Sequence, residues 1–118
     1  MLLGDAERLY TGRAWMIRTV CKLGKRIRCT VRHWQSIVQK HDALARLADA
    51  VADTLQHPSY IRLSKEDDRV FLYYAPRGKY VLCVVCRHLN GDGFIITAYL
   101  TDRIKRGVTV YEADSDHL

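Results

Sequence analysis

Gly93-Phe-Ile-Ile-Thr-Ala-Tyr-Leu-Thr101 is the stretch of sequence that decides the fold. β-Branched and aromatic residues fill it, which is typical of a strand. Alternation along a strand divides the residues between two faces. One face carries three hydroxyl groups and comprises Ile95, Thr97, Tyr99 and Thr101, whereas the other is purely apolar and comprises Phe94, Ile96, Ala98 and Leu100. The apolar face predicts packing against a core.

Three more strands precede this one, at residues 60–64, 69–74 and 79–88. The segments 75–78 and 89–93 contain the Gly, Pro, Asn and Asp residues that favour turns, so the strands are expected to pair as antiparallel hairpins. Residues 109–111 predict a short last strand.

The N-terminal part predicts a hairpin and then helix. Two β-rich runs, 14–21 and 26–31, flank a turn in which Gly24 is free to take positive φ. A long apolar stripe at three- and four-residue spacing then predicts helix from Arg32 to Gln56. Thr30 is a candidate cap for its start, Asp42 a candidate break that caps a second helix, and Pro58 its end.

Together these elements predict an α+β domain: an N-terminal hairpin, then one or two helices packed on a four- to five-stranded antiparallel twisted sheet. The domain is expected to span residues 1–111, followed by an acidic C-terminal tail, 112–118. No apolar run reaches the roughly 18 residues of a membrane span, and the first residues lack a signal-peptide pattern. A cytoplasmic location is expected.

Charge is distributed unevenly along the chain. Residues 1–40 hold nine Lys or Arg and two acidic residues, a net charge of +7, whereas the chain as a whole carries +6. Arg26 and Arg28 share one face of the predicted hairpin. A patch of this kind attracts nucleic acid, and the alternative is a solvated face that only keeps the protein soluble.

Four cysteines, Cys21, Cys29, Cys83 and Cys86, contain one Cys-x-x-Cys spacing that is typical of half a zinc site. Cys83 and Cys86 lie inside a predicted strand, where residues three apart point to opposite faces. We therefore expect buried free thiols and no metal.

Several side chains are candidates for chemistry. His41 lies in the helical stripe, where a half-buried imidazole suits acid–base work; a structural histidine is the alternative. The hydroxyl face of 93–101 stands before the basic residues Arg103, Lys105 and Arg106, which is typical of a phosphate cradle or of an ordinary solvated strand. Cations and aromatic rings near the strand ends are further candidates for RNA contact: Tyr73, Tyr74, Arg77, Lys79 and Arg87.

The combined pattern resembles a known group of proteins. Trp34-x-x-Ile37-x-x-x-His41, Thr54-x-x-x-Pro58, Tyr73-Tyr74, the Leu82–Val85 strand and Ile95–Thr101 followed by Lys105-x-Gly107 resemble small phage and bacterial proteins of the barnase–EndoU–colicin–RelE-like nuclease superfamily. The likeness extends from about Gly12 to Tyr111.

The resemblance implies metal-independent, cofactor-free RNA cleavage through a 2′,3′-cyclic phosphate, and toxin biology with an antitoxin encoded nearby. His41 matches the helix histidine of the superfamily, and Thr97 and Tyr99 match its last long strand. Relatives often carry a second histidine where this chain has Ser36, and Pro-Glu where it has Asp42-Ala43. These departures point to a weakened or inactive protein if that histidine is catalytic.

Two hypotheses follow. In a ribonuclease, His41 acts as general base or acid, Arg87 and Lys105 stabilise phosphate charge, and Thr97 and Tyr99 position the phosphate. The substrate is then expected to contact six further residues: Arg26, Arg28, Tyr74, Arg77, Lys79 and Arg103. The alternative is an inactive RNA- or protein-binding module with the same fold.

Overall fold

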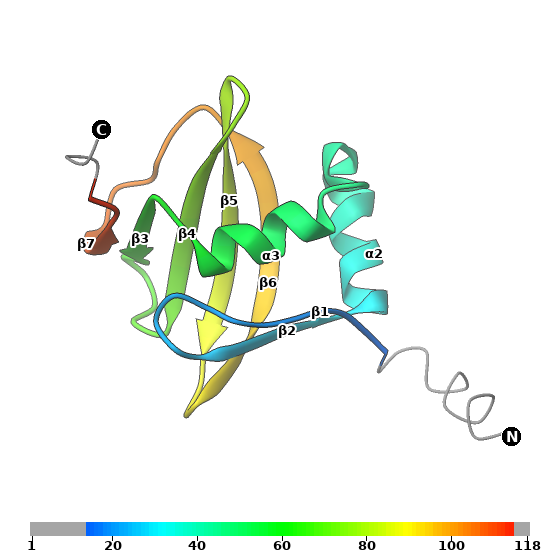
Figure 1. Ribbon diagram of the computed structural model, residues 1–118, viewed down its shortest axis with the longest axis horizontal. Coiled ribbons are helices and arrows are strands. Elements are labelled where there is room, and N and C mark those ends of the chain that lie inside the picture. Colours follow the sequence, from blue (N-terminus) through cyan, green and yellow to red (C-terminus); the bar gives the residue numbers. More distant parts are fainter. Residues whose placement is uncertain (1–13, 115–118) are drawn as a thin grey trace, which may run out of the picture.

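The structure is a computed structural model that describes residues 14–114. Within that range the chain forms two α-helices, one short 3₁₀ helix and seven strands (Figure 1). In chain order these are β1 (Trp15–Val20), β2 (Arg26–Thr30), α2 (Val31–Lys40), η2 (Asp42–Leu44), α3 (Ala48–Gln56), β3 (Tyr60–Leu63), β4 (Val70–Arg77), β5 (Tyr80–His88), β6 (Asp92–Thr101) and β7 (Val108–Glu112).

All seven strands belong to one sheet with the order β1-β2-β6-β5-β4-β3-β7. Neighbours are antiparallel except for β2 and β6, which are parallel. The α+β class and the mainly antiparallel sheet are therefore confirmed. The sheet is larger than the expected four or five strands because the N-terminal hairpin joins β6 and the last strand joins β3. Both pairings are long-range contacts, which no local pattern specifies.

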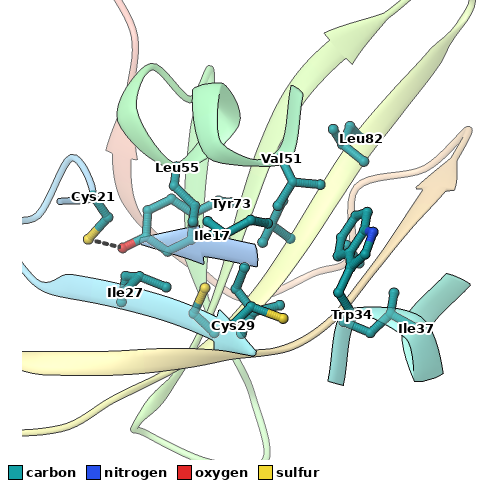
Figure 2. Packing of buried hydrophobic residues seen from close by; sticks show 14 of the residues in the cluster. Ile17, Cys21, Ile27, Cys29, Trp34, Ile37, Val51, Leu55, Tyr73 and Leu82 are labelled. Atoms are coloured by element: carbon teal, nitrogen blue, oxygen red, sulfur yellow. Dashed lines mark hydrogen bonds between the residues drawn. The ribbon is translucent and has the colours of Figure 1, made fainter. Parts of the chain in front are cut away.

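The helices cover one face of the sheet. In Figure 1, α3 crosses β4 and β5, the β1–β2 hairpin runs across the same strands, and α2 stands beside β6. The side chains between these elements form the main core, part of which Figure 2 shows around Ile17, Trp34 and Leu55. Burial of such apolar surface is worth about 25 cal/mol per Å² and dominates the stability of the domain.

The predicted helix of residues 32–56 is two helices. Thr30 caps α2 as expected, since its hydroxyl accepts the His33 backbone N–H at 3.0 Å. The first helix ends at Lys40, and η2 separates it from α3. Asp42 begins η2 but makes no capping hydrogen bond, and α3 has Leu47 at its N-cap, so the predicted capping role of Asp42 is wrong.

A bulge changes the predicted faces of β6. The pairing of β5 with β6 shifts between Val85 and Cys86, which leaves Ile96 without a register partner. Ile95 is consequently buried in the helix-side core with Ala98, whereas Thr97 and Tyr99 face the other way. The expectation that Ile95 shares the face of Thr97 is wrong, because an extra residue in one strand reverses the alternation beyond it.

The expectation that the four thiols are buried and free is confirmed. All four thiols are free and buried. Cys83 and Cys86 belong to core clusters on opposite faces of β5. Burial raises the pKa of Cys29 and of Cys83 to about 11, so both thiols stay protonated near neutral pH.

His88 is a buried polar group on the helix side of β5. The Tyr73 hydroxyl lies 2.9 Å from its Nε2 and 2.9 Å from the Sγ of Cys21, and Figure 2 shows the latter contact. The Phe71 ring stacks on the imidazole with centroids 4.0 Å apart. Burial, followed by the charge of Lys25, lowers the pKa of His88 from 6.5 to about 4. The imidazole is therefore neutral in the folded protein near pH 7.

His88 makes stability depend on pH. In the unfolded chain His88 is protonated below about pH 6.5, whereas in the folded chain it is protonated only below about pH 4. The contribution of neutral His88 to the free energy of unfolding is therefore complete above pH 6.5 and is lost as the pH falls toward 4. We expect the melting temperature to decline over this window. In His88→Gln the protein should be less stable at pH 7 but the decline should be shallower. The control is His57→Gln, since the His57 side chain is 71% exposed; an unchanged slope in His88→Gln would contradict the assignment.

Candidate functional site

The face of the sheet opposite the helices carries the candidate site. Leu72, Tyr74 and Cys83 form a second, smaller core cluster there. Residues 102–107, called the strap below, link β6 to β7, which are separated in the sheet by β5, β4 and β3. Figure 1 shows this connection passing from the end of β6 to the far edge.

Two hydrogen bonds and one close approach hold the strap. The Lys105 backbone N–H donates to the Tyr74 hydroxyl at 3.0 Å, and Arg62 Nη1 donates to the Lys105 carbonyl at 3.4 Å. At Gly107 an added Cβ would lie 2.5 Å from the Leu63 carbonyl oxygen, so only glycine allows the strap to approach β3 this closely. The strap is thus a tied segment of the fold.

A cleft of about 480 Å³, called the strap cleft, opens between the strap and the connection from β3 to β4. Its walls are charged and polar: Ser64, Lys65 and Glu66 on one side, Lys105 and Arg106 on the other. Its floor is the sheet itself, formed by Val70, Leu72, Val85, Thr97 and Tyr99. Three cations and one carboxylate therefore surround a floor that presents a threonine and a tyrosine ring.

Three of the five predicted catalytic residues, Thr97, Tyr99 and Lys105, line this cleft. His41 follows the last turn of α2, where its backbone N–H donates to the Ile37 carbonyl at 2.9 Å. Its half-buried ring lies 5.9 Å from the Tyr99 ring, centroid to centroid. His41 is not a lining residue, so it adjoins the cleft through Tyr99.

Arg87 lies on the same face but outside the strap cleft. Its Nη1 donates to Asp67 Oδ2 at 2.7 Å, and the Arg69 backbone N–H donates to Asp67 Oδ1 at 2.9 Å. The Arg69 and Arg87 donors lower the pKa of Asp67. Arg87 thus fastens the β3–β4 connection, the segment that carries Glu66, and positions one wall of the cleft.

The hydroxyl groups of this face differ in accessibility. The Tyr99 hydroxyl is buried and has no hydrogen-bond partner among residues 14–114. Burial, followed by the Cys83 thiol, raises its pKa well above the usual value for a tyrosine, so it remains protonated. The Tyr99 residue therefore forms part of the floor, whereas its buried hydroxyl is not exposed to a substrate.

The predicted stacking role of Tyr73 and Tyr74 is wrong. Both rings are 0% exposed, because one packs in the helix-side core and the other lies beneath the strap. Tyr74 acts through its hydroxyl, which holds Lys105. Paired tyrosines alternate between faces in a strand, and here both faces are covered.

The other predicted substrate-binding residues fall into two groups. Arg26 and Arg28 lie on β2 beside the start of β6, and Arg28 Nη1 is 2.9 Å from Asp92. At the opposite end of the sheet lie the β4–β5 turn and the strap, with Arg77, Lys79 and Arg103. From Phe94 to Thr101, β6 extends about 23 Å at 3.3 Å per residue. These cations lie at the two ends of the sheet.

The wall residues Ser64, Lys65 and Glu66 are not among the residues predicted for the site. They belong to the charged run Ser64–Arg69, which the sequence identifies only as a connection, whereas Arg106 belongs to the basic segment predicted as one side of a phosphate cradle. The one available signal is the pairing of a carboxylate with cations between two strand ends. This charge pattern indicates a site only once the fold is known, because the strap brings Arg106 to the same cleft as Lys65.

No protein family, curated protein or solved structure matches this chain. Among the described residues, no group of three or more His, Cys, Asp or Glu side chains is arranged to hold a metal ion. No helix within residues 14–114 is both long enough and apolar enough to cross a membrane.

Tyr74→Phe tests the attachment of the strap. The change leaves the buried ring in place but removes the acceptor of the Lys105 N–H, so we expect a loss of about 1 kcal/mol in the free energy of unfolding and faster hydrogen exchange at the Lys105 amide. Urea denaturation and exchange measure the two effects. Tyr80→Phe, on an exposed ring, is the control and should change neither. Unaltered exchange at Lys105 would show that this bond does not hold the strap.

Proposed function

We propose that this protein is a metal-independent endoribonuclease that binds RNA on the open face of the sheet and cleaves it in the strap cleft. The observation that carries the proposal is the convergence of Lys65, Lys105 and Arg106 around Glu66 over a floor that contains Thr97. Cationic walls, one of which also carries a carboxylate, suit a phosphodiester whose neighbouring hydroxyl must lose a proton.

The cations account for charge stabilisation. Attack of the ribose 2′-oxygen on phosphorus gives a five-coordinate phosphorane with additional negative charge on its oxygens. Lys65 approaches from the β3–β4 connection, and Lys105 and Arg106 approach from the strap, so that charge meets cations on two sides. In this proposal the side-chain cations stabilise the negative charge that a divalent metal ion stabilises in other nucleases.

Two groups supply the proton transfers. Glu66 lines the cleft, so we assign it the removal of the 2′-hydroxyl proton. We assign to His41, which lies beside the Tyr99 ring and does not line the cleft, the donation of a proton to the departing 5′-oxygen through one bridging water. The P–O5′ bond breaks as the P–O2′ bond forms, which leaves a 2′,3′-cyclic phosphate and a 5′-hydroxyl. Tyr99 stays protonated and serves as the contact between His41 and the cleft.

Ser36, which stands where relatives in the superfamily often have a histidine, does not line the strap cleft. Ser36 is exposed on α2, its hydroxyl lies 3.4 Å from the Arg32 carbonyl, and it borders a different hollow, beside Met16 and Trp34. A histidine lost from that position leaves Glu66 and the cationic walls unchanged. The resemblance extends the proposal to toxin biology, in which a nearby-encoded antitoxin would cover the cleft.

A binding module without catalysis is the second candidate. It is favoured by the two predicted catalytic side chains that do not line the cleft: Arg87, held by Asp67, and His41, behind Tyr99. In such a module the same cations hold an RNA backbone or an acidic protein without acting on it. Where the partner is RNA, the two candidates differ in whether the bound RNA is cut.

Purified protein incubated with total RNA in excess EDTA should cleave it, since the charge stabilisation comes from side chains. The 3′ ends should carry 2′,3′-cyclic phosphate, detected by their resistance to ligation until the cyclic phosphate is opened and removed. Activity that vanishes with chelator and returns with magnesium would refute the metal-independent mechanism. Binding without cleavage under both conditions would favour the binding module.

Single substitutions test the proton-transfer roles. Glu66→Gln and His41→Ala should each reduce cleavage by about 10²–10⁴-fold, the range for a lost general base or acid, with melting temperatures near that of the wild type. The exposed Glu112→Gln is the control for Glu66, and should retain full activity. Loss of the basic limb of the pH–rate profile in His41→Ala is expected if His41 is the acid. A large fall in melting temperature with activity retained would make His41 structural.

A further inference from the structure

A second hollow lies where β2 and β6 separate. The two strands pair only over Arg26–Arg28 and Asp92–Phe94, after which β2 passes into α2. His33 spans the gap: its Nε2 lies 2.8 Å from the Ile96 carbonyl oxygen, and because that oxygen only accepts, Nε2 must carry the hydrogen. The space between is a slot of about 380 Å³, called the fork slot.

Two large exposed rings line the fork slot. Trp15 is 42% exposed and Phe94 is 38% exposed, and neither belongs to a core cluster. Ile96 and Cys29 add to a lining that is mainly apolar. Large aromatic rings that are partly exposed at one site are typical of a surface that binds a flat ligand.

Cations surround the Trp15 ring. The guanidinium carbons of Arg18 and Arg28 lie 5.7 and 5.6 Å from its centroid. Both arginines, with Arg26, also line a hollow of about 610 Å³ that adjoins the slot at Trp15. The one acid of that hollow, Asp92, is already paired with Arg28 at 2.9 Å. An apolar slot therefore continues into a basic groove, which matches a base joined to its phosphate.

We infer that the fork slot takes one unpaired nucleobase of single-stranded RNA, with Trp15 and Phe94 as the stacking surfaces and Arg18, Arg26 and Arg28 along the adjoining backbone. A base in a duplex is already stacked and paired, so only an unpaired one can enter. Phe94 precedes Thr97 by three residues, about 10 Å along β6, and Thr97 lies in the strap cleft. The inference rests on the proposed function for the choice of RNA as the ligand and for placing this base a short distance from the cut.

The test uses a 2′-O-methyl oligonucleotide, which has no free 2′-hydroxyl and cannot be cleaved by the proposed route. Trp15→Ala should weaken its binding, measured by fluorescence anisotropy, by about 5- to 150-fold, the equivalent of about 1–3 kcal/mol for one stacked base at 1.4 kcal/mol per tenfold. The salt dependence should be unchanged. Arg26→Ala should instead lower the slope of log affinity against log salt by roughly one. Tyr80→Ala, an exposed ring beside Lys79, is the matched control and should bind normally.

An abasic oligonucleotide completes the test. In a series of oligonucleotides, the single abasic position is moved along the strand. At one position the wild-type protein should lose as much affinity as Trp15→Ala loses for the intact strand. At that position the affinity of Trp15→Ala should not fall further. A fully paired duplex should bind more weakly than the single strand. A matching DNA strand tests whether the sugar matters, and DNA binding equal to RNA would overturn the assignment to RNA. Wild-type affinity in Trp15→Ala would overturn the slot itself.

The outcomes separate this inference from the proposed function. Trp15-dependent binding without any cleavage of natural RNA would uphold the slot and reject the nuclease. Cleavage that is equally efficient in Trp15→Ala and wild type, with the same KM, would uphold the nuclease and reject the slot.

Discussion

The parallel contact of β2 with β6 at Gly93 is the constraint on which the rest of the structure depends. Gly93 pairs with Ile27 on one side and with His88 on the other, so three strands meet at this position. An added Cβ would lie 2.3 Å from the Arg87 carbonyl oxygen and 3.0 Å from Cδ1 of Ile27. A residue without a side chain is therefore required for β6 to approach the β5 backbone this closely at the position where β2 joins its other edge. Once β2 is attached there, the chain from β2 to β3 must pass over one face of the sheet, and it does so as α2 and α3.

As a result, the face of the sheet that the helices cover and the open face differ in what they carry. The helix-side face holds the main core, including the thiols of Cys29 and Cys86, and the buried His88. The open face keeps only a small apolar cluster beneath the strap, and its remaining surface presents charge. Because β2 joins β6 over three residue pairs and then diverges, the same attachment also opens the fork slot. A single strand, β6, thus connects the slot at Phe94 with the cleft at Thr97.

Much of the fold follows from local patterns that the sequence displays directly. Alternation identified every central strand, Gly24 takes the expected positive φ of 88°, and Thr30 caps the first helix. The break between the helices was placed near Asp42, although its cause is the 3₁₀ turn rather than a cap. For the site, Thr97, Tyr99 and Lys105 were predicted together, and they line one cleft. Lys65 and Glu66 are absent from the predicted site, since the sequence does not show where a charged connection lies relative to the strands, whereas Arg106 belongs to the predicted basic segment after the last long strand.

The sequence by itself determined the α+β class, the hairpin, the strands and the burial of the four thiols, because these depend on periodicity and on residue type over a few neighbouring positions. Only the tertiary structure decided the seven-strand order, the bulge at Ile96 and the route of the strap, because each depends on contacts between residues far apart in the chain. The bulge shows the reason most directly: one unpaired residue, set by the partner strand, exchanges the faces of its neighbours and moves Ile95 into the core. The strap likewise changes the role of Tyr74. The sequence predicts that its ring is open to RNA, whereas in the fold the ring is buried and its hydroxyl accepts the Lys105 N–H.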